Sequence, residues 1–316
     1  MNRNLLPLSE EAERLLQIGL SLQSTQRSAD DEIASALRDV IEQDKLPDGK
    51  KVIILVLNQL GAYDSASTLF SPELLEDKQM QLIYAEILIR SGEAEQAISF
   101  IEEHLTPAAQ EDADFLDQMG RLSDLSRFIA HRDYDRNEVP MYRLAALISL
   151  AVKLGYTETA LMLAGFEVDL QCLLIDALYQ EGYAEEAKRH LSHLPDPLSL
   201  GSQQLFRNIA FISAEMLHDE GCYKEASRIF EALICLAPEM ARARFGAASC
   251  YLHETMANLI KRIELYHPSE EERGKIDKYL DTLQQTLLTL ESSNWHTSWN
   301  PVQQKNLEGR ERLSLN

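Results

Sequence analysis

The sequence predicts an all-α protein, an α-solenoid of antiparallel helix pairs with helical caps at its ends. Three observations lead to this fold class. A short phrase containing Gly and Ala recurs five times, apolar residues upstream of it recur at helical steps, and neither strand alternation nor an Asn-Gly hairpin signal appears. The chain has 316 residues, of which 45% are hydrophobic and 26% charged, and this composition fits a folded globular protein.

The recurrent phrase is a Gly followed five residues later by an Ala. The five pairs are Gly61 with Ala66, Gly92 with Ala97, Gly155 with Ala160, Gly182 with Ala187, and Gly221 with Ala226. Gly permits the positive φ that ends one helix, and Ala lets the second helix approach the first closely. Four copies carry a Tyr just after the turn, which would fill the space between hairpins: Tyr63, Tyr156, Tyr183 and Tyr223. The phrase therefore predicts the turn of a helical hairpin.

One interval between these turns is too long for a single unit. Gly92 and Gly155 are separated by about twice the distance between Gly61 and Gly92. We therefore expect a further hairpin turn near Gly120, where Leu125 stands at the position of the Ala.

The repeated units resemble the tetratricopeptide repeat (TPR) family. Residues 207–240 match its pattern best, followed by residues 78–111, which lack the closing proline. The matching positions of the first unit are Ala214, Gly221, Tyr223, Ala226, Phe230 and Pro238, and those of the second are Ala85, Gly92 and Ala97. Elsewhere the small residue of the first helix is replaced by Ile54, Ile148 or Ile175, so the resemblance is partial there. It implies a TPR-like superhelix over residues 47–262.

The two ends differ from the repeats. We expect an N-terminal helical cap over residues 1–46, with helices at 7–23 and 30–43 whose first turns are acidic. A C-terminal capping helix is expected over 263–291, because Ser269 and Glu272 form a capping box. That helix carries one apolar side, made of Ile276, Leu280, Leu283, Leu287 and Leu290. Residues 292–316 are expected to form a tail.

Charge and cysteine usage restrict the partners and the compartment. The net charge is −21 and its excess lies in residues 1–240, which disfavours nucleic acid and anionic membrane surfaces and is compatible with a basic partner. No apolar run approaches the roughly 20 residues of a membrane span. Four scattered cysteines and a polar amino terminus predict a cytoplasmic protein.

Motifs that carry chemistry are not found, so we predict no enzyme activity, no cofactor and no metal. The sequence has no phosphate-binding glycine loop, no G-x-S-x-G and no H-E-x-x-H. The nearest histidine pair, His190 and His193, lacks a third ligand close in sequence. Three cysteines lie among apolar neighbours and the fourth, Cys222, lies at a repeat turn, which favours buried small hydrophobes over nucleophiles.

The family resemblance implies a concave groove lined by the first helix of each pair, which suits a peptide or protein partner. The groove residues that it implies are Gln79, Leu82, Glu86, Arg90, Asp169, Asp176, Tyr179, Asn208, Phe211, Glu215, His218 and Asp219. Four of the five acids in this list together favour a basic partner: Glu86, Asp176, Glu215 and Asp219. The Lys and Asn spacing that clamps chaperone tails is absent, because Lys51 is followed four residues later by Leu55.

Two functions follow from these features. The first is a non-enzymatic scaffold that binds a protein or peptide in the groove. The alternative is an accessory helical-repeat component of a bacterial glycosyltransferase or protein-modification system, whose chain ends the tail resembles. Trp295 and Trp299 are the chain's two tryptophans, and we expect them to dock around Leu283 and Leu287 rather than on a partner.

Overall fold

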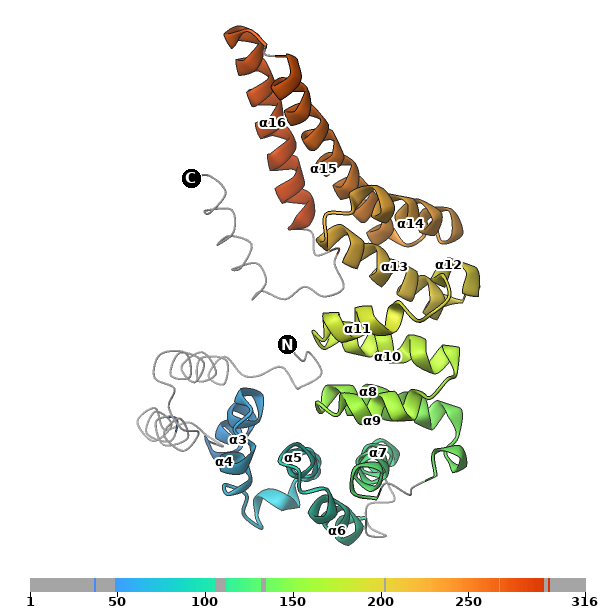
Figure 1. Ribbon diagram of the computed structural model, residues 1–316. Coiled ribbons are helices and arrows are strands. Elements are labelled where there is room, and N and C mark those ends of the chain that lie inside the picture. Colours follow the sequence, from blue (N-terminus) through green and yellow to red (C-terminus); the bar gives the residue numbers. More distant parts are fainter. Residues whose placement is uncertain are drawn as a thin grey trace. The chain divides into compact units, whose positions relative to one another are not determined.

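The computed structural model describes residues 37, 49–105, 112–131, 135–201, 203–266, 268–292 and 295 (Figure 1). These residues form α-helices, two short 3-10 helices and turns, and no strand occurs among them. They belong to two compact units, residues 1–163 and residues 164–316, called here the first and second unit. The predicted fold class, an all-α solenoid of helix pairs, is confirmed for this part of the chain.

The first unit contains α3 to α8 and all but the last residue of α9. Its helices are α3 (Gly49–Leu60), α4 (Tyr63–Ser67), η1 (Leu74–Glu76), α5 (Lys78–Arg90), α6 (Ala94–His104), α7 (Ala113–Ala130), η3 (Arg136–Glu138), α8 (Met141–Lys153) and α9 (Thr157–Ala164). α3 with α4, α5 with α6, and α8 with α9 are the pairs joined by the recurrent phrase. Their apolar stripes are buried, as shown by Ala85 on α5 and Ile148 on α8.

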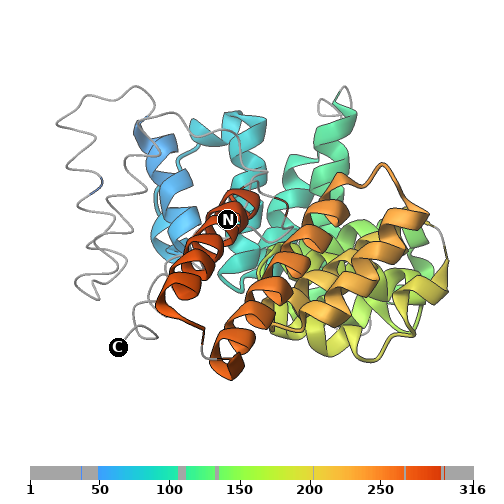
Figure 2. The same cartoon turned by 90° about the horizontal axis from the view of Figure 1, so that it is seen from above.

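The second unit contains α10 to α16. Its helices are α10 (Val168–Gln180), α11 (Ala184–Leu191), α12 (Pro197–Leu200), α13 (Gln204–Asp219), α14 (Tyr223–Leu236), α15 (Ala241–Tyr266) and α16 (Glu270–Glu291). α10 pairs with α11, α13 with α14, and α15 with α16 (Figure 1). Figure 2 shows the same side-by-side arrangement of the two long helices α15 and α16.

All five glycines of the phrase adopt positive φ, between 77° and 89°. In each turn the Gly N–H bonds to the carbonyl three residues before it, and the next N–H bonds to the carbonyl five residues before its own position. In the α13–α14 turn, for example, Gly221 N donates to His218 O at 2.9 Å and Cys222 N to Leu217 O at 2.8 Å. This pair of bonds is the Schellman motif, which satisfies the last carbonyls of the first helix. The phrase therefore marks helix ends as predicted.

The Ala of each phrase is fully buried, as expected where two helices cross closely. Three of the four turn tyrosines reach another helix pair. The Tyr63 hydroxyl accepts a bond of 2.9 Å from Arg90 Nη1, Tyr156 donates to Ile89 O at 2.5 Å, and Tyr223 stacks on His253. Packing and hydrogen bonding between pairs therefore use a tyrosine that lies at the turn.

The expected hairpin turn near Gly120 is wrong. Residues 113–130 form one continuous helix, α7, and Gly120 lies in its middle. A Cβ on Gly120 would lie 2.9 Å from Arg143 Nη2, and Arg143 binds Asp117 and Asp124 of α7 at 2.7 and 2.8 Å. Gly120 thus makes room for an arginine that joins α7 to α8, and it does not end a helix.

The chain's ends are described in part. The predicted N-terminal cap lies outside the described residues except for Leu37, which is helical, buried and packed in the same core cluster as residues of α3. The capping box of Ser269 and Glu272 opens α16 as predicted, and the predicted apolar side contains its buried residue, Leu287. The division of the chain into caps and repeats at the stated boundaries stays a prediction.

No helix among the described residues has both the length and the apolar character that crossing a membrane requires.

The second unit has a core cluster centred on Phe230, which packs against Phe211 and Trp295 with ring centroids 5.5 and 5.9 Å away. Gly246 of α15 faces this ring, since a Cβ built on it would lie 2.5 Å from Phe230 Cζ. Close contact of α15 with α14 therefore depends on a glycine.

Gly246→Ala is expected to lower the free energy of unfolding by about 1–3 kcal/mol, because the methyl group would displace the buried Phe230 ring. Ala is otherwise the better helix former. The matched control is Gly274→Ala on α16, where nothing lies within 4 Å of the added Cβ; it should raise stability by about 0.5–1 kcal/mol. Urea denaturation followed by circular dichroism measures both. Stabilisation by both substitutions would contradict the packing of Phe230 on α15.

Candidate functional site

A hollow of about 330 Å³ lies on the second unit and is lined by α10, α13, the start of α15 and the turn before α15. These three helices are the first members of successive pairs. α10 contributes Asp176 and Gln180, α13 contributes Asn208 and Phe211, and α15 contributes Arg242. We call this feature the α10–α13–α15 hollow. It combines two carboxylates, amides, a guanidinium and the largely covered ring of Phe211, which together suit a polar peptide segment.

Arg242 connects the hollow with the core beneath it. Its guanidinium carbon lies 4.7 Å from the centroid of Phe211, a cation–π contact. Its Nη2 lies 3.8 Å from Oε1 of the buried Glu215, and its Nε donates a bond of 2.8 Å to the carbonyl of Trp295. The cation therefore compensates a buried carboxylate and also binds the backbone of Trp295.

Asp176 is the half-buried acid of the hollow. Burial raises the pKa of its carboxyl group, while a hydrogen bond of 2.9 Å from Gln180 and the charge of Arg242 lower it in part. A carboxylate that has lost water contacts gains more from a cation than an exposed one does. This wall of the hollow thus favours a positively charged group on a ligand.

The eight predicted groove residues of the second unit fall into three places. Asp176, Asn208 and Phe211 line the hollow. Asp169 and Asp219 are exposed outside its lining, and Tyr179, Glu215 and His218 are buried. The buried three pack within the unit and present little surface, and the assignment of all eight to a partner groove stays a prediction.

The four predicted groove residues of the first unit lie on α5. Gln79 is exposed, Leu82 is half-buried, and Glu86 forms an ion pair of 3.4 Å with Lys153 of α8. Arg90 donates to the Tyr63 hydroxyl and, at 3.2 Å, to the carbonyl of Lys153. Glu86 and Arg90 thus hold helices together. Their role toward a partner stays a prediction.

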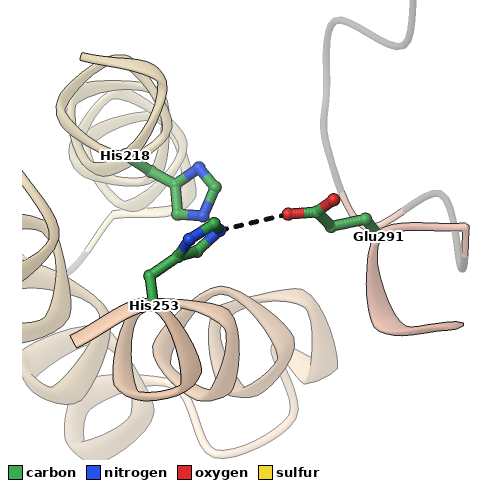
Figure 3. A group of neighbouring side chains, drawn as sticks. All are labelled: His218, His253 and Glu291. Atoms are coloured by element: carbon green, nitrogen blue, oxygen red, sulfur yellow. Dashed lines mark hydrogen bonds and ion pairs between the residues drawn. The ribbon is translucent and has the colours of Figure 1, made fainter. Parts of the chain in front are cut away.

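A second group of polar side chains lies where α13, α15 and α16 meet (Figure 3). His218 comes from α13, His253 from α15, and Glu291 is the last residue of α16. One donor atom from each lies within 4.8 Å of the other two, and His253 Nε2 is 3.3 Å from Glu291 Oε1. We call this the His218–His253–Glu291 cluster. Two imidazoles and a carboxylate are a donor set that divalent transition metals accept.

Aromatic rings surround this cluster. Tyr223 stacks on His253 with centroids 4.2 Å apart and an interplanar angle of 2°, and Trp295 meets the edge of His218 at 5.3 Å. Trp295 is 1% exposed, so it docks on its own chain as expected. Its position was predicted wrongly, because it packs in the Phe230 core cluster and against His218 rather than around Leu283 and Leu287. Trp299 lies outside the described residues.

The histidine pair that the sequence offered as possible metal ligands, His190 and His193, does not form a metal site among the described residues. His193 lies two residues after the end of α11, with its Nδ1 atom 2.7 Å from Arg189 O, and burial lowers the pKa of the nearby His190. The three-donor group that forms among the described residues does not include this pair.

His253, Glu291 and Arg242 were not predicted as site residues from the sequence, because no local motif contains them. The repeat length offered a signal, since His253 follows His218 by 35 residues and Arg242 follows Asn208 by 34, placing each pair on successive first helices.

The cysteines should differ in reactivity. Burial raises the pKa of Cys172 to about 11 and that of Cys250 to about 12, so both remain protonated at pH 8, whereas Cys235 is exposed. We expect Ellman's reagent to label Cys235 within minutes and to leave Cys172 and Cys250 unmodified until the protein is unfolded. Peptide mapping after labelling identifies the sites. Rapid labelling of Cys250 in the folded protein would contradict its burial.

Comparison with known proteins finds structural neighbours only. No family model matches the chain, and no curated protein does. A chain in the structure of Naa15/Naa10 bound to HypK-THB aligns over 82% of this chain at 16% identity, with a TM-score of 0.31. The TPR domain of P58(IPK) aligns over 96% of this chain and 98% of its own length at 15% identity, with a TM-score of 0.21. The chain spans only 43% of the first neighbour.

Proposed function

We propose that the protein is a non-enzymatic scaffold that binds a segment of another protein in the α10–α13–α15 hollow. The observation that carries this proposal is the hollow itself, because it is lined by the first helices of three successive pairs. Three of the residues implied by the TPR resemblance, Asp176, Asn208 and Phe211, lie on its walls. Stacked helical repeats create extended concave surfaces, and proteins of this kind use those surfaces to bind their partners.

The proposed partner segment carries a basic side chain and polar backbone or amide groups. The basic side chain would face Asp176, whose partly desolvated carboxylate gains from a cation. Gln180 and Asn208 offer amide donors and acceptors, and the exposed part of Arg242 can bind a carbonyl. The net charge of −21 supports the same choice, since it attracts basic partners over long range. Four free cysteines support the proposed cytoplasmic location.

The test is affinity capture with the full chain, compared between wild type and Asp176→Lys by quantitative mass spectrometry. The control is Glu231→Lys, the same kind of charge change on the exposed face of α14. We expect a specific partner to be retained by wild type and by the control, and to fall at least tenfold with Asp176→Lys because of charge repulsion. Higher salt should weaken capture.

Capture that is unchanged by Asp176→Lys would contradict binding in the hollow, provided that circular dichroism shows the variant to be folded. The identity of the captured protein separates the two functions. A glycosyltransferase or another modifying enzyme would select the accessory-component alternative, and a non-enzymatic protein would select the scaffold.

A further inference from the structure

We propose that His218, His253 and Glu291 form a zinc site that fastens α16 to α13 and α15. This site is independent of the proposed partner binding. Its three donors come from three different helices of one compact unit, so a bound ion would join elements that otherwise meet through side-chain packing. Zinc accepts imidazole nitrogen and carboxylate oxygen, and sites with three protein ligands keep one position for water or another ligand.

One donor separation matches that of a tetrahedral site, and the other two are no longer than 4.8 Å. With bonds of about 2.0–2.2 Å, two ligands of tetrahedral zinc lie about 3.3 Å apart. His253 Nε2 and Glu291 Oε1 already have this separation, 3.3 Å, and all three donors lie within 4.8 Å of one another. Small rotations of the partly exposed Glu291 side chain would bring its oxygen nearer His218. Figure 3 shows the two imidazoles and the carboxylate facing a common centre.

Groups next to the cluster restrict its donor side chains and balance the charge of a bound zinc ion. The Nδ1 atom of His218 lies 3.5 Å from Asp219 Oδ1, so a carboxylate lies beside the ring nitrogen on the side away from Ser249. Ser249 Oγ lies 2.8 Å from that Nε2 and would turn away when zinc binds. The carboxylates of Glu291 and Asp219 together match the charge of one Zn²⁺. The aromatic ring of Tyr223 covers His253 and limits its movement.

The burial of the donors fits a site that an ion can enter. His218 is 7% exposed, whereas His253 and Glu291 are 23% and 36% exposed. One side of the cluster therefore reaches solvent while the other is anchored in the core. Glu291 precedes the buried Trp295 by four residues, so zinc would fix the end of α16 that adjoins this residue in the sequence.

The experiment titrates the full chain, freed of metal with a chelator, with ZnCl₂ against a chromophoric competitor. We expect one ion per chain, and a rise in Tm of about 5 °C at a zinc concentration a hundred times Kd. Substitution with Co²⁺ should give the intense visible absorption of a tetrahedral site. His253→Ala and Glu291→Gln should each weaken zinc binding at least about tenfold and reduce the cobalt absorption.

The matched control is the double variant His190→Ala and His193→Ala, which removes the other histidine pair of the unit and should leave zinc binding unchanged. Ser249→Ala should keep or strengthen binding, because its hydroxyl competes for His218 Nε2. The proposal is overturned if zinc does not bind, if the His190 and His193 variant abolishes binding, or if His253→Ala and Glu291→Gln, folded by circular dichroism, bind zinc like wild type.

Discussion

Trp295→Ala is expected to lower the free energy of unfolding of the second unit by about 3–5 kcal/mol. The indole is 1% exposed and packs edge-on against Phe230 and His218, at centroid distances of 5.9 and 5.3 Å. Truncation would leave a cavity in the Phe230 core cluster that α13, α14 and α15 cannot fill without moving. It would also loosen the segment whose carbonyl accepts the bond from Arg242. Urea denaturation followed by circular dichroism measures the loss.

Trp295→Phe is the matched control, because it keeps an aromatic ring in the same place and should recover much of the stability. Its cost should be smaller than that of the Ala variant by at least about 1 kcal/mol. A Trp295→Ala protein with the same unfolding midpoint as wild type would show that the indole does not close the core.

Ala226→Trp is expected to cost about 3 kcal/mol or more. Ala226 is fully buried and belongs to the same core cluster as Ala210 and Ala214 of α13, where the two helices approach closely. A side chain of indole size cannot enter this space without separating α13 from α14. Thermal unfolding followed by circular dichroism should show a lower Tm.

The control for Ala226→Trp is the same large residue at an exposed position of the same helix, Arg228→Trp. That change should alter stability by no more than about 0.5 kcal/mol. If Ala226→Trp were tolerated equally well, α13 and α14 would not be packed through their small residues.

The hairpin turns were predictable from the sequence because their cause is local. A Gly with positive φ and an Ala in the next helix form a recognisable pattern within six residues of sequence. Gly92 and Gly221, for example, end their helices by the same two hydrogen bonds. The turn predicted at Gly120 was wrong because a glycine inside a helix can make room for a neighbouring side chain without ending the helix. Its space is taken by Arg143, a residue of the next helix, and no local pattern reports that contact.

The candidate site was less predictable because burial depends on distant residues. Glu215 and His218 lie on a first helix at positions that the TPR resemblance assigns to a groove, yet Arg242 and Trp295 cover them. The C-terminal segment that supplies Trp295 has no helical period and its docking place could not be derived from spacing. Likewise, Glu291 joins the histidines only because α16 folds back along α15.

The most direct test of the central claim, that first helices of the second unit bind a protein segment, is site-specific photo-crosslinking. A photoreactive amino acid replaces Gln204 on the wall of the hollow, or Lys224 on the exposed face of α14 as the control. We predict a cross-link to one partner protein from position 204 and none from position 224, with the linked peptide containing a basic residue. Equal cross-linking from both positions, or cross-linking from position 224 alone, would contradict binding in the hollow.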